Sequence, residues 1–247
     1  MISYYSPMLS ERHVHVWVLR TSVSDSLAAK FEPLLMADEK ERAARFRFDH
    51  LRRSFIVTRG TLRCLLGYYL DVHPTRLRFC YGSKGKPALL PAAGIEFNCS
   101  HSGELSLFAF TFGCDIGVDL ERTRPFIEAQ SMADQLFCAE EAEEIASLPP
   151  LEREHAFLRC WTRKEAYVKA TGDGLSAALD QFRVTLQVNE PARFVCFVQD
   201  IRAAENWALH DLSVDPEYIA AVAYRDRQRS VSLFQIEDAE VIVPLDL

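Results

Sequence analysis

Apolar residues recur along this 247-residue chain with two spacings, one typical of helices and the other of strands. The longest helical pattern covers residues 50–70, where Phe55, Leu62, Leu65, Leu66 and Tyr69 share one face. Further helices are predicted over 24–36, interrupted near Pro33, and over 39–46, 127–137, 139–147 and 151–171, with Asp38 as a cap for the second. Strands are predicted over 13–19, 77–81, 95–98, 106–112, 115–121, 182–188, 194–199, 207–212, 219–224 and 231–235.

The order of these elements predicts an α+β fold, in which long helices pack on antiparallel sheets. Residues 82–87, Gly-Ser-Lys-Gly-Lys-Pro, predict a loop, because two glycines and a proline end regular structure. No sequence repeat or low-complexity linker divides the chain.

Charge, the lengths of the apolar runs and the cysteine pattern together indicate a protein that acts neither on nucleic acid in general nor in a membrane. The 28 basic and 35 acidic residues give a net charge of −7, which argues against a general nucleic-acid binder because such proteins normally carry a basic field. No apolar run reaches the length of a membrane span, so we expect no membrane partner. The seven cysteines form no Cys-x-x-Cys pair, which predicts reduced thiols in a cytoplasmic protein.

Residues 161–174, Trp-Thr-Arg-Lys-Glu-Ala-Tyr-Val-Lys-Ala-Thr-Gly-Asp-Gly, predict a helix and its end, since Gly172 and Gly174 stop it. Glu165 and Lys169 are four residues apart, so their side chains stand on one face. On its own such a pair is usually a solvated surface pair. Its meaning therefore depends on the segments upstream.

Residues 117–121, Gly-Val-Asp-Leu-Glu, predict a strand in which Asp119 and Glu121 point the same way. Two carboxylates on one face repel each other and resist burial, and a divalent cation between them resolves both problems. Hard oxygen ligands at this spacing suit magnesium or manganese, with Glu165 as a third carboxylate. Taken alone, the pair is more simply explained as solvated residues at a strand end.

Four segments together resemble the surfactin-type 4′-phosphopantetheinyl transferases. They are residues 85–87 (Gly-Lys-Pro), 97–102 (Phe-Asn-Cys-Ser-His-Ser), 117–121 and 161–169, and their order and rough spacing match the family. The resemblance covers about residues 37–174. It implies an enzyme that moves the phosphopantetheine arm of coenzyme A onto a serine of an apo acyl or peptidyl carrier protein. Magnesium is required, and the other product is adenosine 3′,5′-bisphosphate.

The resemblance also implies an architecture that the sequence pattern does not show. Family members consist of two similar α/β halves related by a pseudo-twofold, with the active site at their interface. The boundary falls near Gly113 here. This gives an N-terminal half, residues 1–112, for the adenosine and phosphates, and a C-terminal half, residues 113–247, for the metal site and carrier docking. We expect a monomer, because one chain already holds both halves.

Coenzyme A carries a pyrophosphate and a 3′-phosphate, so its site needs several cationic or N–H donors. The resemblance implies that Lys86 and His101 reach coenzyme A and that the first helices hold its adenosine end. The predicted coenzyme A ligands are Arg42, Arg53, Lys84, Lys86, Pro87, Ser100, His101, Asp119 and Lys169.

Glu165 and Lys169 are the predicted catalytic residues, and Asp119, Glu121 and Glu165 are the predicted metal ligands. Lys169 and Lys86 place positive charge around the pyrophosphate. Glu165 either takes the proton from the carrier serine or binds the metal, and the sequence leaves both roles open.

Carrier docking is predicted for residues 122–137, beside the metal pair. This segment begins with Arg122 and Arg124, which suit an acidic carrier protein. Its apolar side chains divide between the core and the docking surface; they are Phe126, Ile127, Met132, Leu136 and Phe137.

Two other classes share these features. A metal-dependent hydrolase of a nucleotide pyrophosphate needs the same carboxylates and cations, and it releases the bisphosphate without a carrier. A non-catalytic module that binds coenzyme A or a carrier protein predicts binding with no turnover. The sequence does not identify the carrier protein or its pathway.

Overall fold

The computed structural model describes residues 8–21, 24–125, 128–174, 178–200 and 202–244. The elements in chain order are β1 (His13–Arg20), α1 (Asp25–Phe31), η1 (Glu32–Leu34), α2 (Ala37–Ala44), α3 (Asp49–Leu70), η2 (Pro74–Arg76), β2 (Phe79–Tyr81), β3 (Pro87–Leu89), β4 (Ile95–Ser102), β5 (Leu105–Phe112), β6 (Ile116–Arg122), α4 (Ala129–Leu136), α5 (Ala139–Ala146), α6 (Pro150–Thr171), η4 (Leu179–Gln181), β7 (Phe182–Val184), β8 (Phe194–Phe197), α7 (Ala203–Asn206), β9 (Trp207–Asp211), β10 (Tyr218–Arg225), β11 (Ser230–Ile236) and η5 (Ala239–Ile242).

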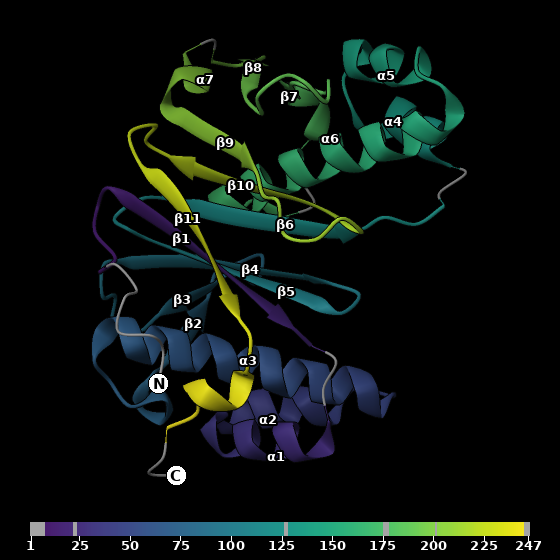
Figure 1. Ribbon diagram of the computed structural model, residues 1–247. Coiled ribbons are helices and arrows are strands. Elements are labelled where there is room, and N and C mark those ends of the chain that lie inside the picture. Colours follow the sequence, from purple (N-terminus) through teal and green to yellow (C-terminus); the bar gives the residue numbers. More distant parts are fainter. Residues whose placement is uncertain (1–7, 22–23, 126–127, 175–177, 201, 245–247) are drawn as a thin grey trace.

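Two sheets form the middle of the molecule, and helices cover the outer face of each (Figure 1). One sheet has the strand order β11-β1-β5-β4, and α3 packs on its outer face. The other has the order β6-β10-β9, and α6 covers its outer face. The inner faces meet in a core of small and branched side chains such as Val16, Leu107, Val118 and Val222. The predicted α+β class is confirmed.

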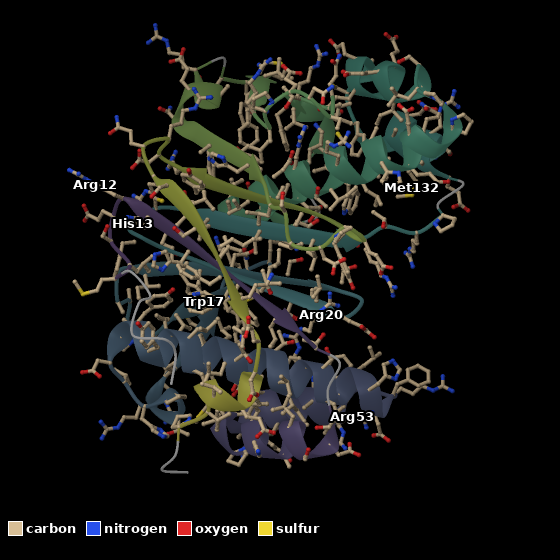
Figure 2. The ribbon with its side chains drawn as sticks, in the orientation of Figure 1. Arg12, His13, Trp17, Arg20, Arg53 and Met132 are labelled. Carbon is tan, nitrogen blue, oxygen red and sulfur yellow. The ribbon has the colours of Figure 1, made fainter. Side chains whose placement is uncertain are left out.

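Strand β1 is buried on both faces because it lies inside this stack. Val14, Val16 and Val18 face the second sheet, whereas Trp17 and Leu19 face the α3 side. Figure 2 shows Trp17 in the interior, beside β11. A strand with helices on one side and a second sheet on the other is therefore apolar at nearly every position.

The end of the chain returns to the first sheet. Strand β11 pairs in parallel with β1, with Val16 opposite Leu233, and η5 then contacts α1 and α3. Residues after the predicted boundary at Gly113 thus complete the sheet of the first half. The boundary itself and the pseudo-twofold stay predictions.

Two local predictions are wrong. Asp38 does not cap α2: the helix begins at Ala37, and the Glu39 carboxylate reaches back to accept from Met36 N at 2.8 Å. The strand predicted over 182–188 ends at Val184, where its pairing with β8 becomes irregular, and the Val184 N–H donates to Glu141 Oε1 at 2.8 Å. The helix predicted from Ile127 begins in residues outside the described part of the chain.

Strand β6 and helix α6 approach each other more closely than side chains normally permit. A Cβ atom at Gly117 would lie 2.1 Å from Ala166 O and 2.4 Å from Ala170 N. Only glycine leaves room for this contact. The next residues on the same face of β6, Asp119 and Glu121, are thereby brought up to α6.

A hydrogen-bonded trio joins β1 to α3. Trp17 Nε1, which can only donate, donates to the Tyr69 hydroxyl at 2.7 Å. The Tyr69 hydroxyl also forms a hydrogen bond with His15 Nδ1, at 2.9 Å. Burial, reinforced by the neighbouring His13, lowers the pKa of His15 from 6.5 to about 4.

We expect Gly117→Ala to destabilise the protein by about 1–3 kcal/mol or more, because the added methyl pushes the α6 backbone away from β6. The midpoint of urea unfolding measures this effect. The matched control is Gly82→Ala, whose Cβ would meet only Lys86 O at 3.7 Å. A Gly117→Ala variant as stable as this control would show that the close contact is dispensable.

We expect Tyr69→Phe to lower the free energy of unfolding by about 1–3 kcal/mol, since it leaves the Trp17 N–H and His15 Nδ1 buried without a partner. Tyr68→Phe is the control, because Tyr68 is 45% exposed and next to it in sequence. Equal stabilities of the two variants in urea would contradict the trio.

We expect the protein to lose stability as the pH falls from about 6.5 towards 4. In this range the unfolded chain protonates His15 while the folded chain, with its pKa of about 4, does not. The free energy of unfolding of His15→Gln should fall less steeply over the same range. Parallel pH profiles of the variant and the wild type would remove His15 as a source of the loss.

Candidate active site

The site is built where the edges of the two sheets meet. Strand β4 is an edge of the first sheet and β6 an edge of the second. Residues 98–102 run alongside 118–122, joined by β4 side chains: Asn98 Oδ1 accepts from Val118 N at 3.0 Å, and Ser102 Oγ accepts from Arg122 N at 3.1 Å. Side chains thus satisfy backbone groups that a sheet edge would leave exposed.

We call the space between these two strand edges, residues 98–102 and 118–122, the seam. A cluster of charged side chains lies in it. Asp119 is buried, and its Oδ1 accepts from Lys169 Nζ at 2.5 Å and from Ser100 Oγ at 3.0 Å. Lys169 Nζ also lies 2.9 Å from Ser100 Oγ. One helical turn earlier on the same face of α6, Glu165 is 7% exposed. Asp119 on β6 therefore lies next to Glu165 and Lys169, which share one face of α6 as their spacing predicts.

Two carboxylate oxygens of this cluster have no donor. Asp119 Oδ2 and Glu165 Oε1 are buried without a hydrogen-bond partner in the described part of the chain. Burial, with the neighbouring charge of Asp119, raises the pKa of Glu165 and that of Glu121. Glu121 Oε2 accepts from Ser102 Oγ at 3.1 Å. The cluster concentrates negative charge that lacks full compensation.

These oxygens have the chemistry of a divalent-cation site. Within the ranges that the structure covers, no group of three or more His, Cys, Asp or Glu side chains is arranged to hold a metal ion, and Lys169 takes one oxygen of Asp119. The unpartnered oxygens of Asp119 and Glu165 nevertheless fit a magnesium ion, which is commonly bound by one or two carboxylates and completed by water and phosphate oxygens. The ligand set of Asp119, Glu121 and Glu165 stays a prediction.

A cleft of about 870 Å³ opens on the other face of β4, towards α2 and α3. Strand alternation divides β4 between the two places: Ser100 contacts Asp119, whereas Cys99 and His101 line the cleft. Ser102, at the end of the strand, contacts Glu121 and also lines the cleft. The basic side chains that line it are Arg42, His50, Arg59 and His101, against one carboxylate, Glu104. An anionic ligand suits this wall.

Of the predicted coenzyme A ligands, Arg42, Pro87 and His101 line the cleft, and the Arg42 guanidinium lies 5.3 Å from the Phe55 ring centre. Burial, with the nearby charges of Lys169 and Arg42, lowers the pKa of His101. Ser100, Asp119 and Lys169 belong to the seam cluster.

The structure places three other predicted ligands elsewhere. Arg53 pairs with Asp25 at 2.9 Å among the helices, far from β6 (Figure 2). Lys86 Nζ donates to Ala170 O at 2.7 Å and Ile116 O at 3.2 Å, and burial lowers its pKa. Lys84 is exposed, with its stem against Gly174. Lys86 thus joins the loop to the end of α6.

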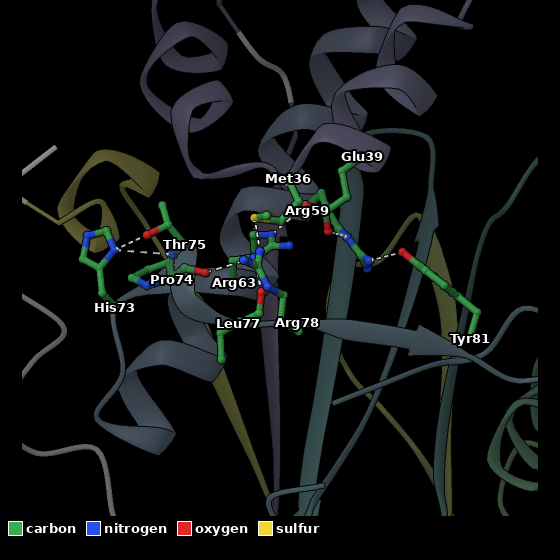
Figure 3. Close-up of polar contacts among 10 residues, drawn as sticks. All are labelled: Met36, Glu39, Arg59, Arg63, His73, Pro74, Thr75, Leu77, Arg78 and Tyr81. Atoms are coloured by element: carbon green, nitrogen blue, oxygen red, sulfur yellow. Dashed lines mark hydrogen bonds and ion pairs between the residues drawn. The ribbon is translucent and has the colours of Figure 1, made fainter. Parts of the chain in front are cut away.

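Sequence reasoning missed Arg59 and Tyr81, both of which line the cleft and bond to each other (Figure 3). The available signal was the pair Arg59 and Arg63, two arginines four residues apart in a helix otherwise rich in apolar residues. A charge on the inner face of a long helix indicates a buried partner, and the partner is Glu39.

The predicted carrier-docking segment is divided by the fold. Phe137 is buried, so it belongs to the core and not to a docking surface. Arg124 is exposed, and Arg122 pairs with Glu217 at 2.9 Å. Phe126 and Ile127 lie outside the described residues. Carrier docking on the remaining surface stays a prediction.

All seven cysteines are free thiols, as their scattered positions predict. None of the helices in the described ranges combines the length and the apolar character that a membrane crossing requires.

Comparison with known proteins assigns the family. The model of the 4′-phosphopantetheinyl transferase superfamily matches residues 115–223. The 4′-phosphopantetheinyl transferase HetI of Nostoc sp. is 40% identical over 213 residues, covering 85% of this chain and 86% of HetI. The transferase psf-1 of Bacillus pumilus is 28% identical over 79% of this chain and 81% of its own, and Sfp of Bacillus subtilis is 27% identical over 64% and 69%. The predicted resemblance is confirmed, and the chain belongs to the 4′-phosphopantetheinyl transferase superfamily, a family of enzymes.

Proposed function

We propose that this protein transfers the 4′-phosphopantetheine arm of coenzyme A to a serine of an apo acyl or peptidyl carrier protein and releases adenosine 3′,5′-bisphosphate. The proposal rests on one observation, which is that the two faces of β4 border two different places. One face of this strand lines a cleft with a cationic wall, and the other lies in a cluster of Asp119, Glu165 and Lys169. A substrate with a phosphate at one end and a reactive pyrophosphate near its middle fits both places.

The chemical step is a substitution at phosphorus. The serine oxygen of the carrier forms a bond to the phosphorus that bears the pantetheine arm. The bond from that phosphorus to the bridging oxygen breaks, and the adenosine 3′,5′-bisphosphate leaves with the electron pair. The nucleophile comes from the partner, so the chain needs no nucleophilic triad of its own.

Lys169 and Glu165 perform separate tasks in this step. The Lys169 ammonium, held by Asp119 and Ser100, stands where it stabilises charge on the pyrophosphate oxygens. Glu165 Oε1 is an acceptor without a donor, so it takes the serine proton directly or through water. If Glu165 is instead a metal ligand, Glu165→Gln should weaken magnesium affinity as well as turnover.

Asp119, Glu121 and Glu165 would hold a magnesium ion, whose charge would offset that of the pyrophosphate. The position of Asp119 does not depend on the ion alone, since Ser100 and Lys169 already hold its Oδ1. The unpartnered Oδ2 is left for a cation.

The test is an intact-mass measurement on apo acyl and peptidyl carrier proteins incubated with coenzyme A and magnesium. We expect each accepted carrier to gain the mass of one phosphopantetheine group, and a carrier whose serine is replaced by alanine to gain none. Bisphosphate release without a carrier would instead favour a hydrolase. Binding of coenzyme A with no turnover for any carrier would favour a binding module.

We expect Asp119→Asn to lower turnover at least a hundredfold, which corresponds to about 3 kcal/mol of barrier, because it removes the charge that orients Lys169 and binds the cation. The matched control is Asp115→Asn, a partly exposed carboxylate before the same strand that pairs with Arg225 at 3.6 Å. Near-normal turnover of a folded Asp119→Asn variant would contradict the site assignment.

A further inference from the structure

The loop between β2 and β3 joins the cleft to the end of α6. Residues 82–87 close on themselves, because Gly82 N donates to Lys86 O at 2.9 Å and Gly85 N donates to Gly82 O at 2.9 Å. Gly85 and Pro87 line the cleft, whereas Lys86 does not. The Lys86 side chain instead reaches α6 and β6.

Two backbone carbonyls bind the Lys86 ammonium. Its Nζ donates to Ala170 O at 2.7 Å, in the last turn of α6, and to Ile116 O at 3.2 Å, at the start of the edge strand β6. The last carbonyls of a helix have no partner within the helix, and a cation there meets the negative end of the helix dipole. One ammonium thus joins the cleft loop, α6 and β6.

This junction coincides with the close approach of β6 and α6. A Cβ atom at Gly117, the residue after Ile116, would lie 2.4 Å from Ala170 N and 2.9 Å from the carbonyl carbon of Lys169. The stem of Lys86 lies at the same end of α6, with its Cδ 3.6 Å from where a Cβ atom of Gly172 would be. The turn that Lys86 holds is therefore the turn that carries Lys169.

The end of α6 does not need Lys86 as its cap. Gly172 already ends the helix in the left-handed conformation, and its N–H donates to Val168 O at 3.0 Å. Burial lowers the pKa of Lys86, although the charges of Asp115 and Glu96 oppose this shift. An ammonium in a partly buried place is costly, and an apolar side chain would avoid the cost. What the ammonium holds in place explains its presence better than the stability of the helix end.

We propose that Lys86 is a positioning residue for the transfer, which holds the last turn of α6 so that Lys169 Nζ stays against Asp119. This inference rests on the proposed function, because Lys169 acts on the pyrophosphate in that reaction. Asp119 Oδ1 and Ser100 Oγ hold the Lys169 ammonium at 2.5 and 2.9 Å, and Lys86 holds the backbone next to it. A displacement of about 1 Å can lower catalysis about a hundredfold. Lys86 therefore acts through Lys169 and does not contact coenzyme A.

The experiment measures coenzyme A binding by titration calorimetry and steady-state transfer to an apo carrier protein. We expect Lys86→Met, which keeps an apolar stem without the ammonium, to lower the turnover number about tenfold or more. The dissociation constant for coenzyme A should change less than about twofold, because no contact to it is lost. Lys86→Arg keeps the charge and donors for two carbonyls, so it should recover about half of the wild-type turnover number or more.

The control for the substitution is Lys30→Met. Lys30 forms an exposed ion pair with Glu240 and lies on α1, away from the seam, so both measurements should match the wild type. Lys86→Gln keeps a donor on a shorter side chain that does not reach both carbonyls. It should show the same loss of turnover as Lys86→Met, and it replaces that variant if urea unfolding shows that Lys86→Met does not fold.

A second background tests whether Lys86 acts through Lys169. In Lys169→Ala there is no ammonium to position, so adding Lys86→Met should lower the turnover number less than about twofold further. The mass of the carrier is followed over long incubations, which resolve slow transfer. A loss by the same factor in both backgrounds would show that Lys86 only supports the fold, and it would contradict the positioning role.

The remaining outcomes separate the two proposals. If the wild type modifies no carrier, the proposed function fails and this inference fails with it. If the wild type transfers the arm but the folded Lys86 variants weaken coenzyme A about tenfold at an unchanged turnover number, Lys86 is a coenzyme A ligand. If those variants leave both quantities unchanged, its bonds to Ala170 and Ile116 have no part in the reaction. In both of these cases the proposed function stands and the positioning role is wrong.

Discussion

The structure depends on the meeting of two sheet edges, β4 and β6. Edge strands carry backbone groups that need partners, and a continuous backbone ladder would fill the space between them. Here Asn98 and Ser102 supply the partners from side chains. The seam can therefore hold the carboxylate of Asp119 beside Ser100, where a ladder would leave no room for a ligand.

The meeting of β4 and β6 also separates acidic from basic side chains. Asp119, Glu121 and Glu165 gather on the α6 side of the seam, whereas Arg42, Arg59 and His101 gather on the α3 side of β4. The contact at Gly117 fixes the distance between β6, which carries Asp119 and Glu121, and α6, which carries Glu165. The basic wall of the cleft suits an anionic ligand directly, whereas the carboxylates beside α6 need compensating charge before an anion can lie next to them.

Much of this arrangement follows from sequence periodicity. The i, i+4 spacing of Glu165 and Lys169 and the alternation of Asp119 and Glu121 place these side chains correctly, because helix and strand geometry are local properties. Periodicity does not predict which residue from a distant part of the chain a side chain will contact. Lys86 sits in a glycine loop that suits a phosphate ligand, yet its ammonium donates to the carbonyls of Ile116 and Ala170, which only the packing of α6 brings near. Arg53 likewise meets Asp25 because α1 folds against α3.

The charged residues of the motif in α6 show why a motif alone does not identify a site. Arg163 and Lys164 are as buried as the core: Arg163 pairs with Asp211 at 2.6 Å, and Lys164 pairs with Glu141 at 2.8 Å and donates to Leu179 O. These two side chains join α6 to β9 and α5. Glu165 and Lys169 lie on the face that meets β6. Neighbouring charges in one helix thus divide between building the scaffold and forming the site, and the face of the helix decides which task each residue has.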